Sequence, residues 1–129
     1  MNREATALWE RAQEALESAE VLLPVSADRA ASNSYYAAFH AVSGLFAEEG
    51  KTFAKHTAVE AAVHRELIKT GRWSKELGVM YSELNEMRRT GDYGGLAHVT
   101  AEEAKRAVQM ARRILEAVRS AHPGFDRKQ

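Results

Sequence analysis

The sequence predicts an all-α protein, an up-and-down bundle of about five helices with a four-helix core, and three observations carry this prediction. Apolar residues recur at intervals of three and four along several long stretches, which is the period of an amphipathic helix. No stretch alternates apolar and polar residues as a strand does. Glycines and prolines fall mainly between the periodic stretches, where helices end. At 129 residues the chain suffices for one domain with a single core.

The first helix is expected from about Asn2 to Leu23. Its apolar stripe consists of residues three or four apart, which are Leu8, Ala12, Ala15, Ala19 and Leu22. Most glutamates of this stretch lie off the stripe, on the side expected to face water. Pro24 ends the helix because the residue before a proline is biased away from the α region.

The second helix is expected to begin near Ser26 or Asp28, both suitable N-cap residues, and to end at Gly50. Residues 30–47 are 18 consecutive residues without a formal charge, in a chain where 28% of residues are charged. We interpret this stretch as a helix buried on more than one face, the central post of the bundle. Because the connection from the first helix is short, the two helices should form an antiparallel hairpin.

Two lines of side chains run along this central helix at helical spacing. One line is mainly apolar and comprises Ala31, Tyr35, Ala38, Val42 and Leu45. The other carries polar groups and comprises Asn33, Tyr36, His40 and Ser43. Two faces of one helix therefore need partners. Since a small bundle covers two such faces incompletely, we expect an exposed remainder that favours a homodimer or a higher homo-oligomer.

The third helix is expected from about His56 to Thr70, with Gly71 after its end and a capping box formed by Thr57 and Glu60. Its inward-facing residues should be Val59, Ala62, Val63 and Leu67. In the turn that follows, we expect Trp73 to plug the end of the bundle.

The fourth helix is expected from about Lys75 to Thr90, with Ser74 as its N-cap and Gly91 at its end. Its apolar stripe is Leu77, Met80, Tyr81, Leu84 and Met87. Residues 91–95, with the sequence GDYGG, are the least helical part of the chain and indicate a compact turn.

The fifth helix is expected to open at Thr100, whose spacing to Glu103 is that of a second capping box. Pro123 and the glycine after it should end the helix. We assign residues 1–121 to a single domain and residues 122–129 to a C-terminal tail, which should be frayed from Phe125 onward.

Charge and composition limit the classes of function. The formal net charge is zero, so a broad, nonspecific nucleic-acid binder is not expected. The charge is uneven, at −5 over residues 1–50, +2 over 51–100 and +3 over 101–129. A local cationic surface and ordinary solvated helix faces are both compatible with this distribution. Because the chain has no cysteine, disulfides, zinc–thiolate sites and cysteine nucleophiles are excluded.

The N-terminus, MNREATALWE, lacks the apolar core of a signal peptide. The uncharged stretch 30–47 is long enough to cross a membrane, but its polar groups would cost free energy in lipid. We therefore expect a cytoplasmic protein with no membrane association. We also expect no cofactor and no bound metal.

Tyr36 and His40 are the first candidate functional pair, because they lie one turn apart on the central helix. Emerging from an uncharged helix, they could line a pocket in which His40 carries a proton. The alternative is a core histidine that is satisfied beside a core tyrosine.

Arg88, Arg89, Asp92 and Tyr93 form the second candidate group, at the end of the fourth helix. Arg88 or Arg89, beside a glycine-rich turn, could hold a phosphate in bidentate fashion. The alternative is a capping salt bridge between Arg88 and Asp92, which are four residues apart. The GDYGG turn is not itself a phosphate loop, because it lacks the Walker lysine and does not follow a strand.

His56, Glu60 and His64 form the third group, spaced four residues apart along the third helix. Two imidazoles and a carboxylate on one line could serve a metal-dependent ribonuclease, although no fourth ligand is evident. The alternative is a row of solvated side chains beside the apolar stripe.

Three stretches occur in the order SNSYYAAFHAVSGLF, KTFAKH and ELNEMRRTGDYGG. Together they resemble the HEPN domain superfamily, above all its small stand-alone branch. That branch has a YYAxFHA helix, a later Lys-His and an Arg-x-x-small-Asp-Tyr turn. The resemblance spans about Ala5 to Val118. The positions that match are Tyr36, His40, His56, Arg88, Asp92 and Tyr93.

The resemblance implies a bundle of four or five helices, often dimeric, with roles in RNA cleavage or in nucleotide-linked toxin–antitoxin systems. Members are often encoded beside a small nucleotidyltransferase. In the active ribonucleases, an Arg is followed after four to six residues by a His, and no metal is needed. The His would activate a ribose 2′-hydroxyl, and the Arg would stabilise charge on the phosphate.

This chain departs from that motif. The next histidine after Arg88 is His98, with nine residues between them, and Asp92 and Tyr93 stand where the catalytic histidine is expected. Asn33 stands where relatives often have Arg. Loss of a positioned general base typically lowers a rate by about a hundred- to ten-thousand-fold, so the departure counts against ribonuclease activity.

The leading hypothesis is a HEPN-type protein that binds a phosphate of a nucleotide or RNA and works with a nucleotidyltransferase in a toxin–antitoxin-like pair. Arg88 would hold the phosphate, with Arg89 beside it. His40 or His56 would be the polar partner, and Tyr36 and Tyr93 would shape the pocket. The alternative is a non-catalytic, dimeric interaction module whose polar residues serve dimer contacts and helix capping.

Overall fold

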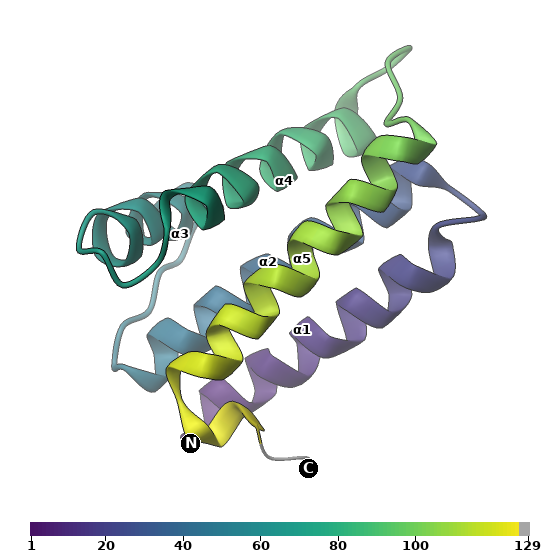
Figure 1. The fold of residues 1–129 in the computed structure, drawn as a ribbon. Helices are drawn as coiled ribbons and strands as arrows, with labels where there is room; N and C mark the ends of the chain where they lie inside the picture. The colour runs from purple at the N-terminus through teal and green to yellow at the C-terminus, as the bar shows by residue number, and fades with distance from the viewer. Residues whose placement is uncertain (127–129) are drawn as a thin grey trace.

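The computed structural model describes residues 1–126, and its regular structure is entirely helical (Figure 1). The α-helices are α1 (Arg3–Leu22), α2 (Ala27–Glu48), α3 (His56–Ala62), α4 (Lys75–Tyr93) and α5 (Ala101–Ala121). Two short segments complete the order, a π-helical turn at Val63–Ile68 and a 3-10 turn at Pro123–Asp126. The predicted fold class is confirmed. No helix within residues 1–126 has the length and hydropathy that crossing a membrane requires.

Helices α1 and α2 form the predicted antiparallel hairpin (Figure 1). Asn2 caps α1 by accepting a hydrogen bond from the Ala5 backbone N–H at 2.8 Å. The amide of Asn2 also donates to the carbonyl of Ala47 at 2.9 Å, which ties the start of α1 to the end of α2. Ser26 caps α2 by accepting from the N–H of Arg29, as expected.

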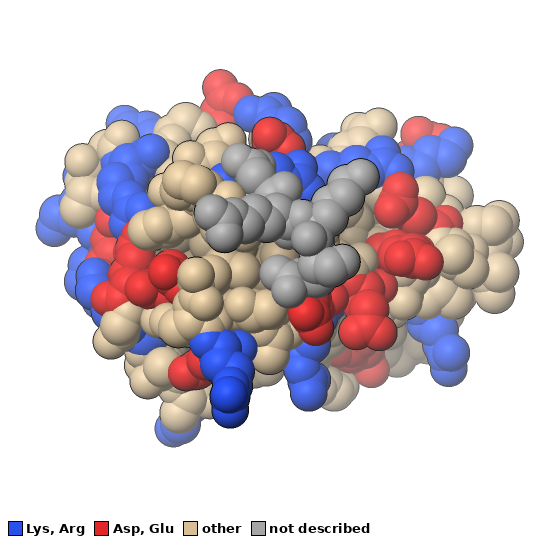
Figure 2. Space-filling model, turned by 90° about the horizontal axis from the view of Figure 1, so that it is seen from below, with Lys and Arg blue, Asp and Glu red and all other residues tan. Residues whose placement is uncertain are grey.

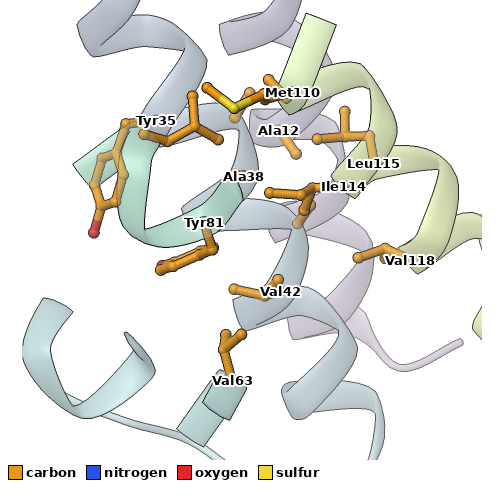
Figure 3. Packing of buried hydrophobic residues seen from close by; sticks show 14 of the residues in the cluster. Ala12, Tyr35, Ala38, Val42, Val63, Tyr81, Met110, Ile114, Leu115 and Val118 are labelled. Atoms are coloured by element: carbon orange, nitrogen blue, oxygen red, sulfur yellow. The ribbon is translucent and has the colours of Figure 1, made fainter. Parts of the chain in front are cut away.

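Helix α2 is the central post, and it packs against α1, α4 and α5. Figure 3 shows how its Ala38 and Val42 meet Tyr81 of α4 and Ile114 of α5 in the core. The single chain thus covers the apolar faces of α2. The exposed large hydrophobic side chains among residues 1–126 lie elsewhere, at Met1, Val21, Val25, Val79, Tyr93 and Leu96. The second line of α2, which comprises Asn33, Tyr36, His40 and Ser43, remains partly exposed.

The third helical segment differs from the prediction of one helix to Thr70. Helix α3 ends at Ala62 and continues as the π-helical turn, in which the N–H of Lys69 bonds to the carbonyl of His64 at 2.9 Å. The predicted capping box is also wrong, because the N-cap is Lys55 and no side chain caps the helix. The side chain of Glu60 turns instead toward α4, where its carboxylate accepts hydrogen bonds from Ser82 and Asn85.

Helix α4 begins at the predicted cap, Ser74, but runs three residues beyond the predicted end at Thr90. Gly91 lies inside the helix rather than at its end. A Cβ atom on Gly91 would lie 2.7 Å from the carbonyl oxygen of Asp28, so its role is to let α4 approach the start of α2 closely. Trp73 is 7% exposed, in line with its expected place at the end of the bundle.

Helix α5 opens with the predicted capping box of Thr100 and Glu103. The expectation that the chain is frayed from Phe125 is wrong. Phe125 is 2% exposed, and its ring lies 5.1 Å from that of Trp9 in an edge-to-face contact. The rest of the expected tail, residues 127–129, lies outside the described part of the chain.

Candidate functional site

Arg88 on α4 is the centre of the candidate site. Its guanidinium carbon lies 5.0 Å from the centre of the Tyr35 ring of α2, which is a cation–π contact across the helix interface. The arginine side chain is only 13% exposed. Its Nε and Nη2 atoms both donate to Oδ1 of Asn85, at 3.2 and 2.9 Å. One edge of the guanidinium is thus fixed by the protein.

Tyr35 connects Arg88 to His56, the first residue of α3. The phenol oxygen lies 3.0 Å from Nδ1 of His56, while the face of the same ring carries Arg88. Tyr35 is fully buried, and burial raises the pKa of its hydroxyl. From the sequence we expected Tyr35 to pack in the core and Tyr36 to line the candidate site with His40. In the structure, Tyr35 contacts both His56 and Arg88.

Aromatic rings surround the imidazole of His56. The Phe39 ring stacks on it at a centroid distance of 4.2 Å and an angle of 8°. Tyr36 meets it edge-on at 5.8 Å. Burial in this setting, and next the positive charge of Arg88, lower the pKa of His56 below its usual value near 6.5. The neutral imidazole is therefore favoured at pH 7.

Asp92 occupies the place where the resemblance led us to expect a catalytic histidine. Its Oδ2 lies 3.7 Å from Nη1 of Arg88, and its Oδ1 accepts a hydrogen bond from the hydroxyl of Ser32 on α2. Asp92 therefore ties the end of α4 to α2, which its sequence position alone did not indicate. Tyr93 is 76% exposed, and Arg89 points to solvent with a 3.2 Å ion pair to Glu86.

His40 lies on a different side of α2 from Tyr35. It lines a hollow of about 380 Å³ with α1 and the loop after α2, beside Arg11, Phe39 and Lys51. Burial first, and then the charges of Arg11 and His56, lower its pKa. Of the two histidines predicted to assist Arg88, the structure brings His56 against the Tyr35–Arg88 pair and places His40 in this separate hollow.

A chain of polar side chains leads from Arg88 toward the outside of the bundle. Asn85 donates to Oε1 of Glu60 at 2.8 Å, and Ser82 donates to Oε2 at 3.0 Å. Ser82 in turn lies 3.0 Å from Nε2 of His64. The predicted line of His56, Glu60 and His64 is thereby divided, because His56 turns to Tyr35 while the other two turn to α4. No cluster of three metal-ligating side chains occurs in residues 1–126.

The outer end of this chain borders a hollow of about 550 Å³ between α4, α5 and the π-helical turn. His64 and Ser82 line it on one side, and Glu83, Glu103 and Arg106 on another. Charges of both signs thus border this hollow. Figure 2, which views the molecule from below relative to Figure 1, also shows charges of both signs interspersed outside the area covered by grey residues. On this face neither sign of charge forms a continuous surface.

Five residues of the site were not among the sequence candidates: Ser32, Tyr35, Phe39, Ser82 and Asn85. A usable signal existed for Asn85, because Ser82, Asn85 and Arg88 recur at intervals of three on one side of α4. For Tyr35 no such signal existed, since a tyrosine on the apolar line of an uncharged helix is predicted to be a core residue.

The arrangement leaves one edge of the Arg88 guanidinium that an anion could engage. Among residues 1–126, the Nη1 edge of Arg88 has no acceptor nearer than Asp92 at 3.7 Å, so a phosphate oxygen placed there would gain a shorter, charge-assisted bond. His56 can exchange a proton: when Nδ1 carries its proton and donates to Tyr35, Nε2 is free to accept one. Both groups adjoin one buried tyrosine.

Comparison with known proteins identifies related chains. A model of the HEPN domain matches residues 5–121. A UPF0332 protein of Thermotoga maritima is 42% identical over 109 residues, which cover 84% of this chain and 83% of that protein. A protein of Methanocaldococcus jannaschii named "Putative toxin MJ0142" is 33% identical over 104 residues, which cover 80% of this chain and 71% of that one.

The fold also matches a solved structure. The crystal structure of TT1696 from Thermus thermophilus superimposes with a TM-score of 0.80, covering 95% of this chain and 100% of that one. At 23% sequence identity, this similarity bears on the fold alone.

Proposed function

This chain belongs to the HEPN domain family, and we propose that it binds a phosphate group of RNA or of a nucleotide at Arg88. In this proposal it forms one half of a toxin–antitoxin-like pair with a small nucleotidyltransferase. The relative named as a toxin, at 33% identity, supports the second part. The first part rests on the geometry around Arg88.

The observation that carries the proposal is the three-part contact of Arg88, Tyr35 and His56. A guanidinium that serves only as a cap has no need of a neighbouring imidazole held in a fixed orientation. Here the imidazole is stacked on Phe39 and bonded to Tyr35, and the guanidinium lies over the same tyrosine. A phosphate on the free edge of Arg88 would lie next to a residue able to give or take a proton.

The test of phosphate binding is an equilibrium titration with a short single-stranded RNA and with a mononucleotide. Charge-assisted hydrogen bonds contribute about 1.5–3 kcal/mol, so Arg88→Ala should weaken binding by roughly tenfold to more than a hundredfold. Arg113→Ala is the matched control, since Arg113 is an exposed arginine of α5 outside the site. Equal affinities of wild type and Arg88→Ala would exclude Arg88 as the phosphate ligand.

Cleavage is a separate question from binding. If RNA is cut, His56 is the residue we assign as general base, and Arg88 stabilises the charge on the phosphate. An assay of RNA cleavage without divalent metal, with wild type and His56→Gln, tests this assignment. Cleavage that is equal in both variants would remove His56 from the mechanism.

The nucleotidyltransferase partner is tested through the neighbouring gene. Co-expression of this chain with the product of that gene, followed by purification through a tag on one of them, should recover both.

We also propose a homodimer. The partly exposed line of α2 that contains Tyr36 and His40 is the surface we assign to the contact between subunits. Light scattering at micromolar concentration measures whether the dimer forms.

One observation favours the second candidate, a non-catalytic interaction module. Arg88 already has internal partners in Asn85 and Asp92, and Asp92 is itself bonded to Ser32. Such a network would also serve as a lock between α2 and α4. The module predicts no RNA or nucleotide binding at all, whereas the phosphate site predicts binding that depends on Arg88.

A further inference from the structure

We infer that Glu60 is a positioning residue for Arg88 and acts through Asn85. This inference deepens the proposed function and rests on it for the identity of the ligand. It begins from the carboxylate of Glu60, which reaches α4 from α3 and accepts two hydrogen bonds, one from each of two side chains one turn apart. These donors are Ser82 at 3.0 Å and Asn85 at 2.8 Å.

The two ends of the Asn85 amide have opposite roles. Its NH₂ group can only donate and its oxygen can only accept. Because the Glu60 carboxylate can only accept, it engages the NH₂ group and leaves the oxygen to face Arg88. That oxygen accepts from Nε at 3.2 Å and from Nη2 at 2.9 Å. Glu60 thus sets which way the amide points.

Burial enforces this orientation. Asn85 is 5% exposed, so its polar groups depend on protein partners. If the amide were turned, its NH₂ group would face the guanidinium, and both groups are hydrogen-bond donors, so the hydrogen bonds to Arg88 would be lost. With the amide held, Nε and Nη2 of Arg88 face inward, and Nη1 is left on the side of Asp92. The edge available to a phosphate is therefore chosen by Glu60.

Charge supports the same role. Within residues 1–126, Glu60 forms no direct ion pair, and the amide of Asn85 stands between its carboxylate and the guanidinium of Arg88. A partly buried carboxylate is costly unless hydrogen bonds and a nearby opposite charge stabilise it. The carboxylate and the guanidinium stabilise each other through the amide that separates them.

Local structure shows what Glu60 does not do. Its spacing from Thr57 fits a capping box, yet α3 has no side-chain cap. Directly after α3 the backbone widens into the π-helical turn, which carries His64 to the same hydroxyl of Ser82. The segment from Glu60 to His64 is thus built to face α4.

The test measures the solvent exchange of the Arg88 Nε–H by NMR, which needs no ligand. Glu60→Ala should accelerate this exchange about tenfold or more, because Asn85 loses its fixed orientation. Glu60→Gln should restore it to within about threefold, since its amide oxygen can still accept from Asn85 while its NH₂ donates to Ser82. Glu66→Ala, on the same segment but paired with Lys51, is the control and should leave the exchange unchanged.

A double-mutant cycle tests the route through Asn85. In an Asn85→Ala background, Glu60→Ala should have no further effect on the exchange of Arg88. An unchanged exchange rate in Glu60→Ala, or an equal effect in both backgrounds, would overturn the inference. Should Glu60→Ala fail to fold, Glu60→Met replaces it in the cycle, because it fills the volume without accepting a hydrogen bond.

Titration with a short single-stranded RNA separates this inference from the proposed function. Weaker RNA binding by Glu60→Ala, together with faster Arg88 exchange, supports both. Faster exchange with unchanged RNA binding supports the positioning role and contradicts phosphate binding by Arg88.

Discussion

The phenol oxygen of Tyr35 lies 3.0 Å from Nδ1 of His56, so a core residue of α2 holds the first side chain of α3. Because the Tyr35 ring also carries Arg88 on its face, this hydrogen bond places an imidazole beside a guanidinium. One buried tyrosine of the central helix therefore contacts both groups.

The electrostatic link between Arg88 and His56 gives the first prediction. Burial and the charge of Arg88 both keep the pKa of His56 below about 6.5. Replacing Arg88 by Ala removes the second cause, so the pKa of His56 should rise, and the imidazole should protonate at higher pH. An NMR titration of the ring protons measures this, with Arg113→Ala as control. The same pKa in wild type and Arg88→Ala would show that the two groups do not interact.

Asp92 should compete with a bound phosphate. Its carboxylate lies 3.7 Å from Nη1 of Arg88, on the edge assigned to the ligand. Asp92→Asn removes the negative charge and can keep an oxygen for the hydroxyl of Ser32. We expect it to tighten RNA binding roughly 1.4- to fivefold at low salt, since a long, weak ion pair contributes about 0.2–1 kcal/mol. Weaker binding by Asp92→Asn would mean that Asp92 supports the ligand rather than opposing it.

Gly91 should be intolerant of a side chain, whereas Gly44 should accept one. A Cβ at Gly91 would lie 2.7 Å from a backbone oxygen of Asp28, and overpacking of this kind costs about 1–3 kcal/mol. At Gly44 the nearest atoms would be 3.4 Å away, and alanine favours a helix over glycine by up to about 1 kcal/mol. Urea unfolding of Gly91→Ala and Gly44→Ala measures both. Equal stability of the two variants would contradict the close approach of α4 to α2.

Phe125 should contribute to stability as a core residue, although it lies close to the C-terminus. It is 2% exposed and packs on Trp9. Phe125→Ala should lower the free energy of unfolding by about 3 kcal/mol, because it removes a buried aromatic ring and leaves a cavity. Leu96→Ala is the control, since Leu96 is fully exposed and should change stability by less than about 0.5 kcal/mol.

The helices and most of their caps could be predicted because their causes are local. Ser26, Ser74 and Thr100 each cap the helix that follows, and the apolar line predicted on α2 is buried. On α1 the predicted stripe missed Trp9, which is buried. The predicted end of α4 was wrong because we took Gly91 as a helix end, whereas glycine also occurs inside helices. Gly91 is required by contact with Asp28, a residue 63 positions away, which local spacing does not report.

The site could be predicted in part, for the same reason. Arg88 and Asp92 form an ion pair at helical spacing, as the alternative of a capping salt bridge predicted. The choice of His56 over His40 as the neighbour of Arg88 depends on how α3 packs on α2, and the role of Glu60 depends on how α3 faces α4. Neither relation has a signal in the spacing of one helix.

The most direct test of the central claim is an NMR titration of the wild-type protein with a short single-stranded RNA, observing the Arg88 Nε–H and the His56 ring together. The account predicts that both signals shift with one common dissociation constant, and that Arg88→Ala abolishes the His56 shift over the same RNA concentrations. RNA binding that leaves both signals unchanged, or a His56 shift that persists in Arg88→Ala with the same affinity, would contradict it.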